Sequence, residues 1–318
     1  MLVEGACSRV FGSKRARSPM LSNGNLEYIE DIVESKIRKV YSRNELPIVE
    51  QGEPVDVKVA VYTESLANFN TIDMSFNVDF YLRMWWTDPR LAHNSSEVTV
   101  QNRYTVGKIW RPDIYFSNSK EPRSSHRNHQ DQVMKISPNG GIFFSIRLGG
   151  MFSCKQSLHM YPVDSQECYM RILSYSHNAS KLRLSWTESE PLPRNPNISL
   201  AEMEILEITN RTCDATFTRI MGNGEPLNET YSCLQCDIKV KRRIGYHLVQ
   251  TYIPTTIFVI MSWAAFFIDP TAAPARVTLA VTSLLTLTTH AAGLRMSLPK
   301  VSYAKVKSKT SLLRQGKV

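Results

Sequence analysis

The spacing of hydrophobic residues changes twice along the chain, and each change separates two kinds of predicted structure. Residues 24–40 place apolar side chains at steps of three and four, which predicts a short amphipathic helix. From about residue 54 to residue 243, apolar residues alternate with polar ones in short runs, as they do in strands that bury one face. Pro, Gly and Asn separate these runs, which predicts an Ig-like antiparallel β-sandwich. The clearest runs are 55–59, 79–83, 141–147, 181–186 and 237–240, and the expected core includes Trp85, Trp86 and Trp110.

Two apolar segments of different character follow the predicted sandwich. Residues 246–268 contain one histidine and no Asp, Glu, Lys or Arg, and a segment of this length crosses a hydrocarbon layer ~30 Å thick. A second helix is expected over 274–296, where polar and small residues recur at steps of four and three along one helical face. This stripe predicts either a face that lines a water-filled cavity or a contact with another helix. Its members are Thr278, Thr282, Leu285, Thr289 and Gly293.

The expected fold class is therefore mainly β, with an N-terminal helix before the sandwich and α-helical membrane segments after it. The first 23 residues contain no apolar core of signal-peptide length, so 1–23 is interpreted as a tail. The sandwich is expected over 24–243, on the outer side of the membrane. The membrane region is expected over 244–318, with helices at about 246–268 and 274–296 and a basic tail.

Composition and modification motifs support an oxidising compartment outside the cell. The chain has six cysteines and a net charge of +9, and its dispersed basic residues argue against a nucleic-acid-binding protein. His126 and His129 lie in a polar loop, no nucleophile motif appears, and no enzyme, metal site or cofactor is expected. Asn-x-Ser/Thr glycosylation motifs occur at Asn94, Asn178, Asn197, Asn210 and Asn228, all of them before residue 230.

The most specific motif is the segment between Cys154 and Cys168, which contains Tyr161-Pro162-Val163-Asp164. Together with the two apolar segments downstream, it resembles the Cys-loop family of pentameric neurotransmitter-gated ion channels. The stretches 82–91 (LRMWWTDPRL) and 110–118 (WRPDIYFSN) resemble two recognisable parts of the ligand-binding domain of that family. The resemblance covers roughly residues 25–303.

The resemblance implies that an agonist binds between adjacent subunits. Tyrosine rings would cage its ammonium group through cation–π contacts, and Arg83 would pair with its carboxylate. This describes a zwitterionic amino acid. Leu173 stands where glycine and GABA receptors place an ammonium-binding glutamate, which points toward glutamate-gated members, although Glu64 stands where those members have a second arginine. The principal face would carry Tyr115, Ser174, Tyr175 and Tyr231, and the complementary face Tyr81, Arg83 and Ser145.

The resemblance also implies disulfides and a coupling element. Cys154 would pair with Cys168 and Cys213 with Cys233, although Cys236 lies close enough in sequence to compete for Cys213, and Cys7 is left over. Asp164 and Arg242 would form a salt link that transmits binding to the pore. The alternative interpretation of Arg242 is an ordinary basic residue at the membrane surface.

Pro274-Ala275-Arg276 directly precedes the striped helix and resembles the chloride-conducting branch of the family, in which several arginines form a cationic ring at the pore mouth. Leu285 would narrow the closed pore. The alternative for Arg276, a basic anchor on a cytoplasmic turn, is compatible with this role.

The sequence therefore predicts a subunit of a homo- or hetero-pentameric chloride channel in the postsynaptic plasma membrane, with glutamate as the most strongly indicated agonist. The alternatives are a channel subunit gated by glycine or another amine, and a non-conducting binding or decoy subunit. The family has two further membrane helices beyond the segment that resembles its coupling linker, so a truncated gene model or splice form is expected.

Overall fold

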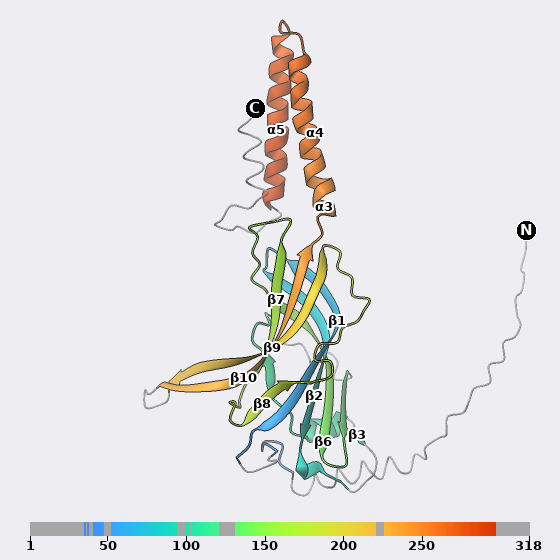
Figure 1. Cartoon of the computed structure of the whole chain (residues 1–318), viewed down its shortest axis with the longest axis vertical. Helices are drawn as coiled ribbons and strands as arrows, with labels where there is room; N and C mark the ends of the chain where they lie inside the picture. The colour runs from blue at the N-terminus through green and yellow to red at the C-terminus, as the bar shows by residue number, and fades with distance from the viewer. Residues whose placement is uncertain are drawn as a thin grey trace, which may run out of the picture.

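The computed structural model describes Ser35, Ile37 and residues 41–47, 52–93, 99–101, 103–120, 131–220 and 226–296. Within this part of the chain, two β-sheets pack face to face and lead into a pair of helices that extends away from them (Figure 1). The prediction of a mainly β fold followed by helices is confirmed. Ser35 and Ile37 are helical and Ile37 is buried in the core, but the rest of the helix expected over 24–40 lies outside the described residues. So do the tail 1–23, Asn94 and the basic tail.

One sheet contains six strands in the order β3-β5-β6-β2-β1-β8. Its pairs are antiparallel except for β1 with β8, which is parallel. Side chains alternate across the sheet, so that Leu82 points into the core while its neighbours Tyr81 and Arg83 lie on the outer face. The strands are β1 (Val55–Asn70), β2 (Ser75–Thr87), β3 (Thr99–Gln101), β5 (Gln132–Ile136), β6 (Gly141–Ser153) and β8 (Leu182–Trp186). The short helices η1 (Pro89–Leu91) and α2 (Arg103–Lys108) lie between β2 and β4 along the chain.

The other sheet contains four strands in the order β4-β7-β10-β9, and all its pairs are antiparallel. Its last two strands form a long hairpin that projects from the body of the sandwich (Figure 1). The projection matters for function because both sides of the hairpin beyond the sandwich are available to a partner. The strands are β4 (Ile114–Phe116), β7 (Ser165–Ser174), β9 (Met203–Ile220) and β10 (Pro226–Arg242).

A buried carboxylate fixes the turns at the end of the sandwich farthest from the helices. The side chain of Asp88 is fully buried and accepts hydrogen bonds from Tyr41 and from the guanidinium of Arg90. Gly140 adopts φ +84°, and a Cβ there would lie 2.5 Å from the carbonyl oxygen of Asp88, so only glycine fits. Arg90 is therefore a structural residue that ties Asp88 to the segment 41–45.

Two of the three tryptophans that were predicted to lie in the core are buried there. Trp86 and Trp110 are buried and contact each other edge to face, with ring centroids 6.1 Å apart. Trp85 was expected in the core, but this expectation is wrong. It points to the outer face of β2, where its ring is only half-buried and lies 5.1 Å from the ring of Phe143. Strand alternation requires this, since adjacent residues of a strand cannot both face the core.

The helical region divides where the sequence breaks the regular pattern of backbone hydrogen bonds. Pro254 has no N–H to donate to the carbonyl of Gln250, and the backbone widens into a π-helical turn just before it. The segment 246–268 is therefore a series of short helical elements rather than one α-helix. In the part of the chain described, no single helix has both the length and the apolar character needed to cross a membrane. The elements are α3 (Gly245–His247), η2 (Leu248–Tyr252), α4 (Ile253–Trp263), η3 (Ala264–Phe267) and α5 (Ala273–Met296).

Candidate functional site

The outer face of the four-stranded sheet gathers aromatic residues from all parts of the predicted principal face. Backbone register aligns Tyr115 of β4 with Leu173 of β7, Leu173 with Cys233 of β10, and Cys233 with Cys213 of β9. Leu173 and Cys233 belong to one buried cluster with Tyr231, against which Tyr115 packs. The strand order therefore brings together residues that lie more than a hundred positions apart in the sequence.

The rings on this face form two edge-to-face pairs. The centroids of Tyr115 and Tyr175 are 5.6 Å apart, and those of Phe217 and Tyr231 are 5.7 Å apart. Tyr231 is almost completely buried, whereas 73% of Tyr175 is exposed. We call these four residues the aromatic face. Their π-electrons suit a cation, and the exposure of Tyr175 leaves one side open to a ligand.

Asp113 fixes the loop that carries Tyr175. Its carboxylate accepts one hydrogen bond from the Ser174 hydroxyl, at 2.9 Å, and one from the backbone N–H of Ser176, at 2.6 Å. The Ser174 hydroxyl also accepts a bond from the N–H of His177. Ser174, predicted as a binding residue, is buried and engaged in these bonds. In the structure, Ser174 therefore holds the loop that positions Tyr175.

Sequence reasoning missed two residues of this site, Phe217 and Glu229. The two residues lie directly opposite each other on β9 and β10, and Glu229 accepts a hydrogen bond of 3.0 Å from the Tyr231 hydroxyl. Glu229 and Tyr231 are two residues apart on one strand and so share a face. This spacing was visible in the sequence, but the hairpin register that brings Phe217 beside them was not.

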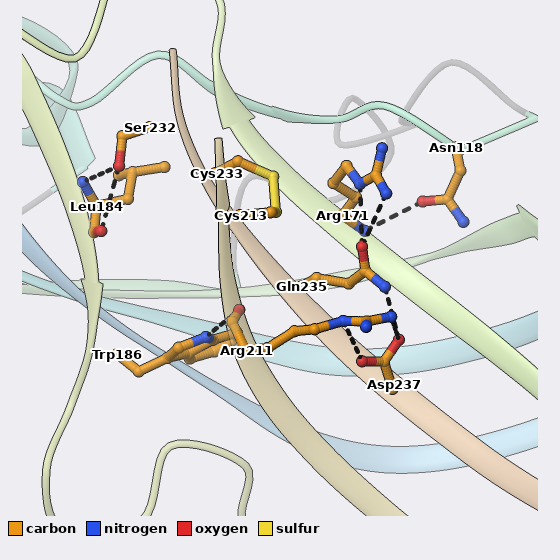
Figure 2. Close-up of a disulfide and its surroundings, with 10 residues drawn as sticks. All are labelled: Asn118, Arg171, Leu184, Trp186, Arg211, Cys213, Ser232, Cys233, Gln235 and Asp237. Atoms are coloured by element: carbon orange, nitrogen blue, oxygen red, sulfur yellow. Dashed lines mark hydrogen bonds and ion pairs between the residues drawn. A yellow bond between two sulfur atoms is a disulfide. The ribbon is translucent and has the colours of Figure 1, made fainter. Parts of the chain in front are cut away.

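A disulfide closes the base of the hairpin. Cys213 and Cys233 are direct cross-strand partners with Cα atoms 4.7 Å apart. Figure 2 shows the polar network beside them: Arg171 donates to Gln235, Gln235 donates to Asp237, and Asp237 pairs with Arg211 at 2.8 Å. This network crosses β7, β10 and β9, and with the disulfide it holds the strands that carry the aromatic face.

The competing pairing of Cys213 with Cys236 does not occur in the structure. Cys236 lies three residues after Cys233, so its side chain points to the opposite side of β10, into the core, where it is completely buried. The Cys154–Cys168 disulfide also forms, with Cα atoms 5.0 Å apart. Cys7 lies outside the described residues.

Cys236 is expected to resist alkylation in the folded chain. Burial raises the pKa of its thiol from 9.0 to about 12, so the reactive thiolate is scarce at pH 8. Folding favours the protonated thiol, and this contribution to stability is present below about pH 9 and is lost as the pH rises toward 12. Mass mapping after iodoacetamide treatment should detect modified Cys236 only in denaturant. Modification in the native chain, or a peptide joining Cys213 to Cys236, would contradict this assignment.

The predicted complementary residues lie on the outer face of the six-stranded sheet. Arg83 on β2 pairs in register with Ser145 on β6, and its guanidinium carbon lies 5.2 Å from the ring centroid of Tyr62. Tyr62 in turn contacts Tyr81, with centroids 6.0 Å apart. Both sheets turn their inner faces to one shared core, so this face and the aromatic face lie on opposite sides of the sandwich. A site that uses both faces therefore needs two copies of the chain, or a related one.

Glu64 stands at the position where the resemblance to glutamate-gated members implies a second arginine. Its carboxylate accepts a hydrogen bond of 3.1 Å from the side chain of Asn195. Within the described residues, Arg83 therefore lacks a second arginine beside it at that position.

The predicted coupling pair forms a buried ion pair where the sandwich meets the helices. The distance between Arg242 Nε and Asp164 Oδ1 is 2.9 Å, and at most 3% of either side chain is exposed. Gln166 also donates to the Asp164 carboxylate. The Arg242 guanidinium lies 4.9 Å from the centroid of the Tyr161 ring, and the Tyr161 hydroxyl is 3.2 Å from Nε2 of His247 in α3. Burial raises the pKa of Tyr161, which keeps its hydroxyl protonated.

These contacts favour the interpretation of Arg242 as a partner of Asp164 over that of a surface anchor. A residue that serves only as a basic anchor at a membrane surface extends its charge into water. Arg242 instead points inward to the loop closed by Cys154 and Cys168, and its backbone N–H also donates to the carbonyl of Asp164. The loop therefore contacts the end of β10 through Asp164 and Arg242, and the first helical element through Tyr161 and His247.

The striped face of α5 is exposed. Leu285 is 61% exposed, and the threonines of the stripe bond their hydroxyls to carbonyls one turn earlier in the same helix, as Thr278 does to Pro274 at 2.7 Å. One contact with α4 is made by His290, whose ring centroid lies 6.3 Å from that of Phe258. Among the described residues, packing therefore does not cover the stripe. Thr278, Thr282, Leu285, Thr289 and Gly293 are all exposed.

The glycosylation motifs are compatible with the hairpin site. Asn197, Asn210 and Asn228 are exposed, and Asn178 is half-buried with its side-chain oxygen bonded to Ser180. Asn228 lies three residues from Tyr231 on β10, so a glycan there would occupy the side of the hairpin away from the aromatic face.

Comparison with known proteins agrees with this geometry. Residues 29–244 match the model of the neurotransmitter-gated ion-channel ligand binding domain, and residues 251–306 match that of the neurotransmitter-gated ion-channel transmembrane region. The chain belongs to the neurotransmitter-gated ion-channel family. Proteins of this family are membrane-embedded ligand-gated channels with an extracellular ligand-binding domain, and they are not enzymes.

Two curated relatives illustrate the branch of the family. The chain is 34% identical over 269 residues to the glycine receptor subunit beta-type 4 of Caenorhabditis elegans, an alignment that covers 83% of this chain and 54% of the relative. It is 34% identical over 254 residues to the glutamate-gated chloride channel of Drosophila melanogaster, covering 79% of this chain and 54% of the relative. This chain thus spans about half the length of these relatives.

Proposed function

We propose that this chain is a subunit of a pentameric chloride channel that a zwitterionic amino acid opens by binding between subunits. The observation that carries the proposal is the division of complementary groups between two sides of one sandwich. The aromatic face supplies rings, Glu229 beside it supplies a carboxylate, and the opposite side of the sandwich supplies Arg83. When two copies meet, these groups match the ammonium and the carboxylate of one amino acid.

Glu229 supplies the charge that Leu173 does not. Leu173 is buried within the cluster beneath the aromatic face and offers no partner to an ammonium group. The Glu229 carboxylate, held by the Tyr231 hydroxyl on the same face of the hairpin, lies where closure of the hairpin would bring it to the ligand. A carboxylate beside aromatic rings binds an ammonium group better than the rings alone, because it adds a charge-assisted hydrogen bond.

Glutamate is the agonist that these features favour, and glycine is the second candidate. The named relatives include one of each kind. Leu173 favours glutamate as the agonist, since glycine receptors of the family have at that position a glutamate side chain that binds the ammonium group. Leu227 and Phe217 near the end of the hairpin add apolar surface that suits a ligand larger than glycine.

The exposed stripe of α5 and its N-terminal arginine support an anion pore. Copies of α5 around an axis would turn Thr278, Thr282 and Thr289 toward water and Leu285 toward the narrowest point. Arg276 lies in the first turn of the helix, where its charge and the positive end of the helix dipole have the same sign. Chloride would therefore concentrate at that end of the pore. The proposed location is the postsynaptic plasma membrane.

Binding of labelled amino acids to membranes from cells that express the chain tests this proposal. L-glutamate is expected to bind, and glutarate, which lacks the ammonium group, is expected to compete poorly. Glu229→Gln should weaken glutamate binding about 10- to 100-fold, the usual effect of losing a hydrogen bond to a charged group.

The matched control is Glu207→Gln, an exposed carboxylate on the same hairpin, which should leave binding unchanged. Equal effects of the two substitutions would show that Glu229 does not contact the ligand. Failure of the unmodified chain to bind either glutamate or glycine would contradict the amino-acid proposal itself.

A further inference from the structure

A second candidate binding site lies between the two sheets, behind the strands that carry the aromatic face. It is a cavity of about 380 Å³, within the size range of small-molecule sites. Ile114 lines it, whereas the next residue of β4, Tyr115, faces the other way, so the cavity and the aromatic face lie on opposite sides of the same strand. Its floor is apolar and includes Leu82, Met84 and Phe144.

The guanidinium of Arg111 lines this cavity and has no acidic partner among the described residues. Its guanidinium carbon lies 5.4 Å from the centroid of the Phe144 ring, and among the described residues no hydrogen bond or ion pair satisfies it. Guanidinium groups removed from water are usually paired with an acid, since an unpaired buried charge is costly.

The other charged groups around the cavity do not compensate Arg111. Arg43 also lines it and is engaged with the carbonyl of Gly107, and His177 adds a further basic group. Desolvation and the charge of Arg43 both lower the pKa of Arg111. The acidic residue of the lining, Asp113, already accepts the bonds from Ser174 and Ser176. The described walls therefore have more positive than negative charge over an apolar floor.

We propose that this cavity binds a small organic anion of the carboxylate class, whose charged end pairs with Arg111 and whose apolar body lies against Phe144 and Met84. Such a ligand would touch the segment Asp113–Ile114 and the loop at Ser176 from behind, and so would influence the positions of Tyr115 and Tyr175. The inference does not depend on which agonist the aromatic face binds.

Saturation-transfer NMR with benzoate and its neutral isostere benzamide, on the purified full chain, tests the proposal. Benzoate should bind and benzamide should bind about tenfold more weakly, because only benzoate forms the charge-assisted bond. Arg111→Gln should weaken benzoate binding by about tenfold or more. Arg111→Lys, which keeps the charge, should retain most of the binding, and thermal melting of both variants checks that they fold.

Two controls separate this site from others. Arg183→Gln changes an exposed arginine of β8 and should have no effect. Arg83→Gln removes the guanidinium of the proposed agonist site and should leave benzoate binding at the cavity unchanged. Absence of benzoate binding to the unmodified chain, equal binding of benzamide, or a loss caused by Arg83→Gln rather than Arg111→Gln would each overturn the proposal. None of these outcomes bears on whether an amino acid binds at the aromatic face.

Discussion

Replacing Arg242 with Ala is expected to lower the free energy of unfolding of the β-sandwich by about 3–5 kcal/mol, the effect of leaving one partner of a buried ion pair alone. The carboxylate of Asp164 would remain buried, with Gln166 as its remaining side-chain donor. The guanidinium also covers the ring of Tyr161, so its removal costs packing as well as charge. Chemical denaturation of the purified chain, followed by circular dichroism of the strands, measures the change.

Two further variants make this result specific to the ion pair. Lys241→Ala alters the neighbouring residue of β10, whose side chain is exposed, and should change the free energy of unfolding by less than about 0.5 kcal/mol. The double substitution Asp164→Leu with Arg242→Met should recover most of the lost stability, because an apolar pair needs no compensation of charge. If Arg242→Ala behaved like Lys241→Ala, the pair would not stabilise the junction.

The same substitutions separate stability from signalling. The apolar double variant keeps the sandwich folded but removes the ion pair between the loop closed by Cys154 and Cys168 and the end of β10, the strand that leads into the helices. If this contact transmits binding to the pore, the variant should bind amino acid normally and give a much smaller current. Current and binding that change together would instead place the pair outside the coupling path.

Arg83→Ala is expected to weaken amino-acid binding by about 2–5 kcal/mol, or roughly 30- to 4,000-fold, as for a charged hydrogen-bonding group removed from a desolvated interface. Arg83 is half-buried on the outer face of the sheet, where its guanidinium contacts the ring of Tyr62, so the fold should tolerate its loss. Arg83→Lys should be intermediate, because lysine keeps the charge but not the planar pair of donors. Competition binding with labelled L-glutamate measures each variant.

The control for this experiment has to be chosen from the structure. Arg90 is bonded to the buried Asp88, so its substitution would report on folding. Arg183 on β8 is exposed and serves instead. Equal losses from Arg83→Ala and Arg183→Ala would refute the role of Arg83.

The elements that the sequence predicted well are those in which a local pattern determines the structure. The alternating runs became strands because burial of one face requires that alternation. The Cys154–Cys168 disulfide and the Asp164–Arg242 pair were implied by the resemblance to a known family, since no local pattern joins residues such as Asp164 and Arg242 that are 78 positions apart. The membrane segment 246–268 was less well predicted, since the effect of Pro254 on the preceding turn depends on backbone geometry that hydropathy does not register.

The residues that the sequence did not identify owe their roles to register and burial. Glu229 and Phe217 meet only because the hairpin pairs β9 with β10 in one register. Cys236 is excluded from the disulfide by the side of the strand on which it lies, and Trp85 from the core for the same reason. Arg111 is a candidate binding residue because its guanidinium has no hydrogen bond or ion pair among the described residues. A sequence cannot reveal this.

The most direct test of the account is the reversal potential of the current that L-glutamate evokes in cells expressing the chain. If Arg276 and the exposed stripe of α5 line an anion pore, the reversal potential should follow the chloride gradient, by about 59 mV for each tenfold change in external chloride. Replacing external sodium with an impermeant cation should leave it unchanged. A reversal potential that follows sodium would contradict the anion pore, and glutamate binding without any current would favour a non-conducting binding subunit.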